Sequence, residues 1–149
     1  MEDNLKTKSD FPGINSPDPV GVKADGTPYG VLIVDDSMFV KKQLTQILTS
    51  EGFKVVETAS HGADGVEKYK AHKDKIDLVT MDITMPGMDG VTALERIIAF
   101  DPEARVVMVS ALGKQDLVKK SFIVGAKNYI VKPLNRQKVI ERLKSVLSG

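Results

Sequence analysis

The chain has 149 residues, 42% of them hydrophobic and 28% charged, a balance typical of one globular domain with a buried core. Its formal net charge of +1 creates no bulk field that would attract nucleic acid or an anionic membrane. It contains no cysteine, which excludes disulfides, thiol catalysis and thiolate metal sites, and its two histidines are too few for a histidine-rich metal centre.

Residues 1–28 differ in composition from the rest of the chain. They contain four prolines and three glycines but few large apolar residues, so they bury too little surface to offset the entropy of ordering. We expect a flexible or loosely docked extension, with partner binding as an alternative role, followed by one folded domain over residues 29–149. The opening MEDNLKTKSD lacks the apolar core of a secretion signal, and no apolar run is long enough to cross a bilayer, which favours a cytoplasmic location.

Five short apolar runs follow from residue 29 onward. They are rich in Val and Ile and are nearly continuous rather than alternating, which is typical of strands buried on both faces of a parallel sheet. In chain order the runs are YGVLIV, FKVVET, IDLVTM, ARVVMV and NYIV.

Stretches of helical length, each with an apolar stripe, separate these runs. Glycine or proline follows several of them, as expected at helix ends. Strands and helices that alternate in this way predict a doubly wound α/β fold with a five-stranded parallel sheet. The stripes, in chain order, are Val40, Leu44, Ile47 and Leu48; Val66 and Tyr69; Val91, Leu94, Ile97 and Ile98; Leu117, Phe122 and Val124; and Val139, Leu143 and Val146.

Four of the five predicted strands end in a side chain with useful chemistry. Ligands of open α/β sheets bind beyond the carboxyl ends of the strands, where the strand order reverses. The second run ends in Thr58, which suits an edge strand and the flavodoxin-like order 2-1-3-4-5. The side chains at the other four ends are Asp35 and Asp36, then Asp82, Ser110 and Lys132.

In that strand order the three aspartates converge on one pocket. Close carboxylates repel one another and their pKa values rise unless a cation intervenes. Mg²⁺ prefers oxygen ligands and commonly takes one or two carboxylates together with phosphate oxygens, so the trio predicts a Mg²⁺ site. Lys132 and Ser110, which flank the pocket, can bind phosphoryl oxygens, and a carboxylate can act as the nucleophile of phosphoryl transfer.

Each of these residues also has an ordinary structural interpretation when it is viewed alone. An Asp or Ser after a strand is commonly a helix cap or a turn residue. A lone lysine such as Lys132 is commonly a solvated surface charge. The phosphoryl-transfer hypothesis rests on the coincidence of all of them at one edge of the predicted sheet.

Four motifs together resemble the response-regulator receiver domain over residues 29–149. They are Asp35-Asp36 after the first strand, MDITMPGMDG around Asp82, Ser110-Ala111 after the fourth strand and Lys132-Pro133 after the fifth. The resemblance implies that Asp82 is the phosphoacceptor.

The resemblance also implies roles for the metal ligands. Asp36, Asp82 and the backbone carbonyl of Thr84 would bind Mg²⁺ directly, and Asp35 would act mainly through water.

Further roles follow for the residues around the phosphoryl group. Lys132 would contact the group, Ser110 would turn to bond it, and Tyr129 would rotate inward as a switch residue. The Lys132–Pro133 peptide bond is expected to be cis.

Within the family, the chain most resembles single-domain receivers of the chemotaxis type. This implies a monomer that a histidine kinase phosphorylates, with the flagellar motor switch and a phosphatase as partners, and without nucleic-acid or membrane binding. It is then a phosphoacceptor in signalling and not an enzyme. A phosphorelay intermediate, or another signalling receiver, is the alternative within the family.

Three alternative functions fit the residues less well. A phosphohydrolase of the haloacid dehalogenase type places a second Asp two residues after its nucleophile, where this chain has Thr84. A flavodoxin-like module for a nucleotide or flavin would need a phosphate-binding loop where Asp35 and Asp36 stand. A degenerate receiver would lack part of the residue set, which is complete here.

Overall fold

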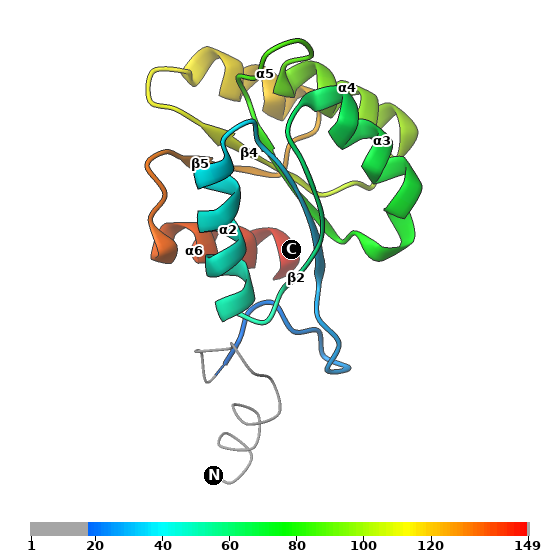
Figure 1. Ribbon diagram of the computed structural model, residues 1–149, viewed down its shortest axis with the longest axis vertical. Coiled ribbons are helices and arrows are strands. Elements are labelled where there is room, and N and C mark those ends of the chain that lie inside the picture. Colours follow the sequence, from blue (N-terminus) through cyan, green and yellow to red (C-terminus); the bar gives the residue numbers. More distant parts are fainter. Residues whose placement is uncertain (1–17, 149) are drawn as a thin grey trace, which may run out of the picture.

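The computed structural model describes residues 18–148 and has a sheet of five parallel strands at its centre (Figure 1). The strand order is β2-β1-β3-β4-β5, so the predicted flavodoxin-like order 2-1-3-4-5 is confirmed. Residues 1–17 of the predicted extension lie outside the described residues. The strands are β1 (Gly30–Val34), β2 (Lys54–Ala59), β3 (Leu78–Asp82), β4 (Val106–Ser110) and β5 (Asn128–Val131).

Helices cover both faces of this sheet (Figure 1). α2 (Met38–Ser50) and α6 (Arg136–Ser148) pack on one face. α3 (Gly62–His72), α4 (Gly90–Phe100) and α5 (Gln115–Val124) pack on the other, and the short 3₁₀ helix η1 (Lys73–Lys75) leads from α3 into β3. Within residues 18–148, no helix combines the length and the apolar character that crossing a membrane requires.

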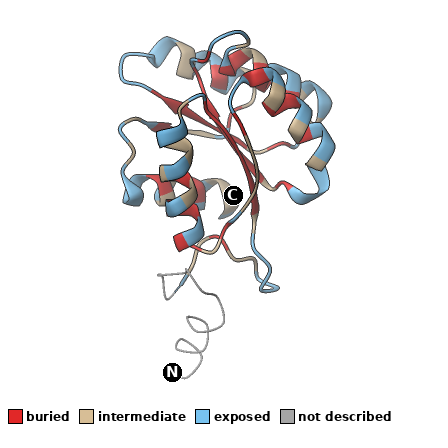
Figure 2. Ribbon diagram, in the orientation of Figure 1, coloured by how far each residue is buried: buried red, intermediate tan, exposed pale blue. Residues whose placement is uncertain are grey.

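The central strands are buried on both faces, as the continuous apolar runs predict. Every residue of β1, β3 and β4 is buried, and alternate side chains enter two separate apolar clusters, one on each face. β2, at the edge, is only partly buried. Figure 2 shows the buried residues concentrated along the central strands and on the helix sides that face them.

Side chains cap the two helices that follow β1 and β3. The first turn of a helix leaves backbone N–H groups without intrahelical partners, and a side-chain oxygen can accept from one of them. Ser37 Oγ accepts from the N–H of Val40 at 3.2 Å, and Asp89 Oδ1 accepts from the N–H of Thr92 at 2.9 Å. These caps fix the backbone just beyond the carboxyl ends of both strands.

The segment of residues 18–28 docks at the opposite end of the sheet. Val22 and Pro28 form an antiparallel bridge, and the N–H of Gly21 donates to the carbonyl of Glu51 at 2.7 Å. Gly21 is buried so tightly against Phe53 that a Cβ at this position would collide with the ring. The domain boundary at residue 28 remains a prediction.

Glu51 joins this segment to the start of α6. Its buried carboxylate accepts from the N–H of Val20 at 3.0 Å and pairs with Arg136 Nη2 at 2.8 Å. We expect Glu51→Ala to lower the free energy of unfolding by about 2 kcal/mol, because the N–H of Val20 loses its acceptor and half-exposed Arg136 keeps only Ser50 Oγ, at 3.0 Å, and water. Urea unfolding checks this, with exposed Glu141→Ala as the control. Equal stability of the two variants would contradict it.

Candidate functional site

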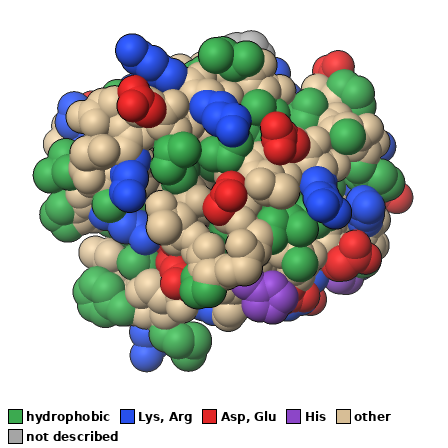
Figure 3. Space-filling view, turned by 90° about the horizontal axis from the view of Figure 1, so that it is seen from above, with side chains coloured by type: hydrophobic (Ala, Val, Ile, Leu, Met, Phe, Trp, Pro, Cys, Tyr) green, Lys and Arg blue, Asp and Glu red, His purple; other side chains and the backbone are tan. Residues whose placement is uncertain are grey.

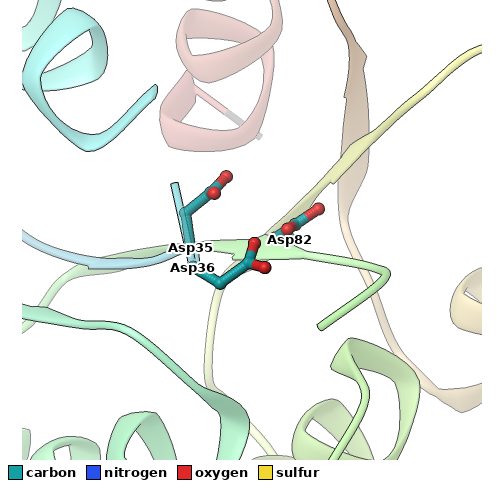
Figure 4. Close-up of side chains that lie close together, drawn as sticks. All are labelled: Asp35, Asp36 and Asp82. Atoms are coloured by element: carbon teal, nitrogen blue, oxygen red, sulfur yellow. The ribbon is translucent and has the colours of Figure 1, made fainter. Parts of the chain in front are cut away.

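The three predicted aspartates converge at the carboxyl ends of β1 and β3 (Figure 4). Asp35 and Asp36 follow β1, and Asp82 is the last residue of the neighbouring strand β3. One carboxylate oxygen from each residue lies within 4.8 Å of the others. Asp35 and Asp82 are buried and Asp36 is exposed, so the cluster is open to solvent on one side and can hold a metal ion.

The two carboxylate oxygens of Asp35 differ in their hydrogen bonding. Oδ1 accepts from the N–H of Ser37 at 2.8 Å, whereas Oδ2 is buried and has no hydrogen-bond partner. A buried carboxylate oxygen without a hydrogen bond is costly, and a cation or its bound water would satisfy it. This buried oxygen without a hydrogen bond, together with the two neighbouring carboxylates, fits a hydrated divalent ion.

Lys132 brings a positive charge to the cluster from the loop after β5. Its Nζ lies 3.3 Å from Asp35 Oδ2 and 3.4 Å from Asp82 Oδ1. The Lys132–Pro133 peptide bond is cis, as predicted from the sequence. One ammonium group therefore faces three carboxylates, which leaves the pocket short of positive charge.

The pKa of Asp82 reflects this shortage. Burial raises the pKa of Asp82 to about 6, helped by the negative charge of Asp35 and a hydrogen bond with Asp36, although Lys132 opposes the shift. The metal-free pocket thus makes Asp82 easier to protonate than an ordinary aspartate. A divalent cation would remove the conflict and keep this carboxylate ionised as a nucleophile.

The structure places Ser110 beside the acidic cluster but does not direct its hydroxyl toward it. Ser110 ends β4, and its Oγ donates to the carbonyl of Ala111 at 2.8 Å. Tyr129 lies in β5 with its ring half buried, and both residues line a pocket of about 340 Å³ between α5 and β5. Thr84 is exposed in the β3–α4 loop, and the role of its carbonyl remains a prediction.

Two residues around the site were not singled out in the sequence. A Cβ on Gly90 would collide with the carbonyl oxygen of Asp82, so only glycine lets α4 begin against the end of β3. The glycine that ends MDITMPGMDG is the signal that points to it. Arg142 stacks over the ring of Tyr129 from α6, and no sequence pattern marks that contact.

The face above the carboxyl ends of the strands carries charges of both signs (Figure 3). Acidic and basic side chains are interspersed there with hydrophobic ones, and no basic surface of the kind that binds nucleic acid extends across it.

Comparisons with known proteins agree with this geometry. The family model described as response regulator receiver domain matches residues 31–144. The chain is 65% identical over 141 residues to the chemotaxis protein CheY of Treponema pallidum, covering 95% of this chain and 98% of that protein. It is 48% identical over 120 residues to the chemotaxis protein CheY of Bacillus subtilis, covering 80% of this chain and 98% of that protein. The Treponema alignment is longer than residues 29–149, so that relative shares part of the N-terminal extension.

A solved structure is similar as well. The crystal structure of the CheX–CheY–BeF3–Mg complex from Borrelia burgdorferi matches with a TM-score of 0.84 and 58% identity. The match covers 87% of this chain and 98% of that chain.

Proposed function

The chain belongs to the response regulator receiver family, and we propose that Asp82 is its phosphoacceptor. It is a chemotaxis response regulator, a close homologue of CheY, and so a signalling phosphoacceptor rather than an enzyme with a diffusible substrate. One observation carries the assignment of Asp82: it lies between two further carboxylates and the ammonium of Lys132, at the neighbouring ends of β1 and β3.

The metal ion in this proposal is Mg²⁺. Asp36, Asp82 and the backbone carbonyl of Thr84 would hold it, with Asp35 acting mainly through water. The buried Asp35 oxygen that lacks a hydrogen bond and the shortage of positive charge support this assignment. The Borrelia relative was solved with Mg²⁺ and BeF3, which adds support. When bound, the ion supplies positive charge that neutralises the carboxylates and the transferring phosphoryl group.

The chain's own residues complete the transfer. A carboxylate oxygen of Asp82 attacks the phosphorus of a phosphohistidine on the kinase, the P–N bond breaks, and the departing imidazole takes up a proton. Lys132, already 3.4 Å from Asp82, stabilises negative charge on the phosphoryl oxygens. Ser110 then turns from Ala111 to donate to one of those oxygens, and Tyr129 rotates toward the space beside it.

The proposed partners follow from the relatives. We expect a histidine kinase as donor, the flagellar motor switch as target, and a phosphatase, since the Borrelia relative was solved in complex with CheX. The acting unit would be a monomeric receiver domain over residues 29–149, preceded by the extension of residues 1–28 and located in the cytoplasm. The family model's match over residues 31–144 supports this division.

Incubation with acetyl phosphate tests the proposal. With Mg²⁺, intact-mass spectrometry should show the gain of one phosphoryl group per chain, and chelation of the metal with EDTA should prevent it. Continuous release of phosphate from phosphoesters over many turnovers would instead indicate a phosphohydrolase. The beryllofluoride form, immobilised on a column, should retain a motor-switch protein. Equal retention of the motor-switch protein by the untreated form would contradict the proposed output.

A further inference from the structure

We infer that Arg142 is a positioning residue that holds the ring of Tyr129 in its resting position, so that Arg142 sets the balance of the switch before phosphorylation. The inference rests on the proposed function and specifies how that same site is regulated. The observation behind it is the stacking of the Arg142 guanidinium over the Tyr129 ring.

Two side chains hold the ring from different helices. The Cζ atom of Arg142, on α6, lies 4.8 Å from the centre of the Tyr129 ring. The ring of Phe122, on α5, meets it edge-on, with the two centres 6.0 Å apart and the planes at 89°. Both are attractive geometries, because a cation favours the ring face and an aromatic edge favours a neighbouring face.

Arg142 is itself held in place by the residue before Tyr129. Its Nη1 donates to Asn128 Oδ1 at 3.4 Å, and its backbone carbonyl accepts from Asn128 Nδ2 at 3.4 Å. Asn128 Oδ1 also accepts from the N–H of Tyr129 at 2.9 Å. Within residues 18–148, no carboxylate forms an ion pair with Arg142, and its guanidinium contacts the Tyr129 ring and the amide oxygen of Asn128.

The pocket beside Ser110 offers space for a second position of the Tyr129 ring. Ser110, Phe122 and Tyr129 all line this space of about 340 Å³. In the structure, the hydroxyl of Ser110 donates to Ala111, the arrangement expected before phosphorylation. A ring that moves toward Ser110 leaves the guanidinium of Arg142, so the stacking stabilises the resting position only.

Because the Arg142 contact exists only in the resting position, it affects how tightly the protein binds a ligand of the rotated form. A ligand that binds only the rotated form must overcome every contact that favours the resting form. A partly exposed cation–π contact shifts such an equilibrium by about two- to five-fold. Loss of the contact should therefore strengthen the apparent binding of beryllofluoride by up to that factor.

The experiment uses the full chain with ¹³C-labelled tyrosine. Its three tyrosines give separate ring signals in ¹H–¹³C NMR, and Tyr129→Phe identifies the relevant one. Arg142→Met keeps an unbranched side chain of similar reach but removes the charge. Lys144→Met makes the same change of charge on the same helix, at an exposed position whose ammonium does not lie over the Tyr129 ring.

In the absence of beryllofluoride, Arg142→Met should move the Tyr129 signal toward the position seen with Mg²⁺ and beryllofluoride. Its apparent dissociation constant for beryllofluoride should fall about two- to five-fold, with Arg142→Lys in between and Lys144→Met unchanged. The inference is overturned if the wild type responds to beryllofluoride and the Arg142→Met variant shows the same Tyr129 signal and the same dissociation constant. A wild type that does not respond at all overturns the proposed function. Matching melting temperatures for the variants would show that partial unfolding does not cause the change in the Tyr129 signal or in beryllofluoride binding.

Discussion

Asp82→Asn is expected to accept no phosphoryl group from acetyl phosphate and yet to be more stable than the wild type when no metal is present. The loss of labelling follows because an amide is not a nucleophile of this kind. The gain in stability follows because the metal-free pocket holds Asp82 beside Asp35, which is also buried. Both effects follow from replacing the one carboxyl group that serves as nucleophile and adds negative charge to the pocket.

The stability effect depends on pH in a definite direction. Burial and the charge of Asp35 raise the pKa of Asp82 to about 6, above its ordinary value of 3.8. Such a carboxyl group stabilises the folded state below about pH 4, and this contribution is lost as the pH rises through 6. At pH 7.5 the variant should therefore be more stable by on the order of 2 kcal/mol, and the difference should disappear near pH 4.

Urea unfolding at these two pH values, with and without Mg²⁺, measures the effect. Mg²⁺ should narrow or reverse the difference at pH 7.5, because it binds the native wild type and not the unfolded chain. Exposed Asp74→Asn is the matched control and should change neither stability nor labelling. A phosphorylated Asp82→Asn variant, or one less stable than wild type at pH 7.5 without metal, would refute this interpretation of the site.

Lys132→Met is expected to bind Mg²⁺ more tightly than the wild type but to be phosphorylated far more slowly. The ammonium lies 3.3 Å from Asp35 and 3.4 Å from Asp82, so its removal leaves the carboxylates more negative toward the metal. The same change removes a donor that is preorganised for phosphoryl oxygens. Loss of one such group typically slows reaction by about 10²- to 10³-fold.

Calorimetric Mg²⁺ titration and the rate of labelling by acetyl phosphate measure the two effects separately. Lys127→Met, an exposed lysine just before β5, provides the control for a general change of charge. Weaker Mg²⁺ binding together with an unchanged rate of labelling would contradict the role proposed for Lys132. A parallel loss of both would indicate local unfolding, which the circular dichroism of the variant would reveal.

The sequence by itself determined the architecture and the membership of the acidic cluster. Short continuous apolar runs rich in Val and Ile favour strands buried on both faces, as β1, β3 and β4 are, and parallel strands bring their carboxyl ends to one edge of the sheet. Asp35, Asp36 and Asp82 therefore had to meet once β1 and β3 were neighbours. The same reasoning placed Ser110 and Lys132 nearby, because each directly follows or ends a strand of that sheet.

Only the tertiary structure decided how these side chains are used. Lys132 spans Asp35 and Asp82, Ser110 turns to its own neighbour Ala111, and Arg142 stacks on Tyr129. Within residues 1–28, for which the sequence predicts a flexible or loosely docked extension, the structure adds hydrogen bonds from Val20 and Gly21 to Glu51. Each of these contacts depends on a side-chain rotamer or on packing between elements far apart in the chain, and neither composition nor periodicity encodes such choices.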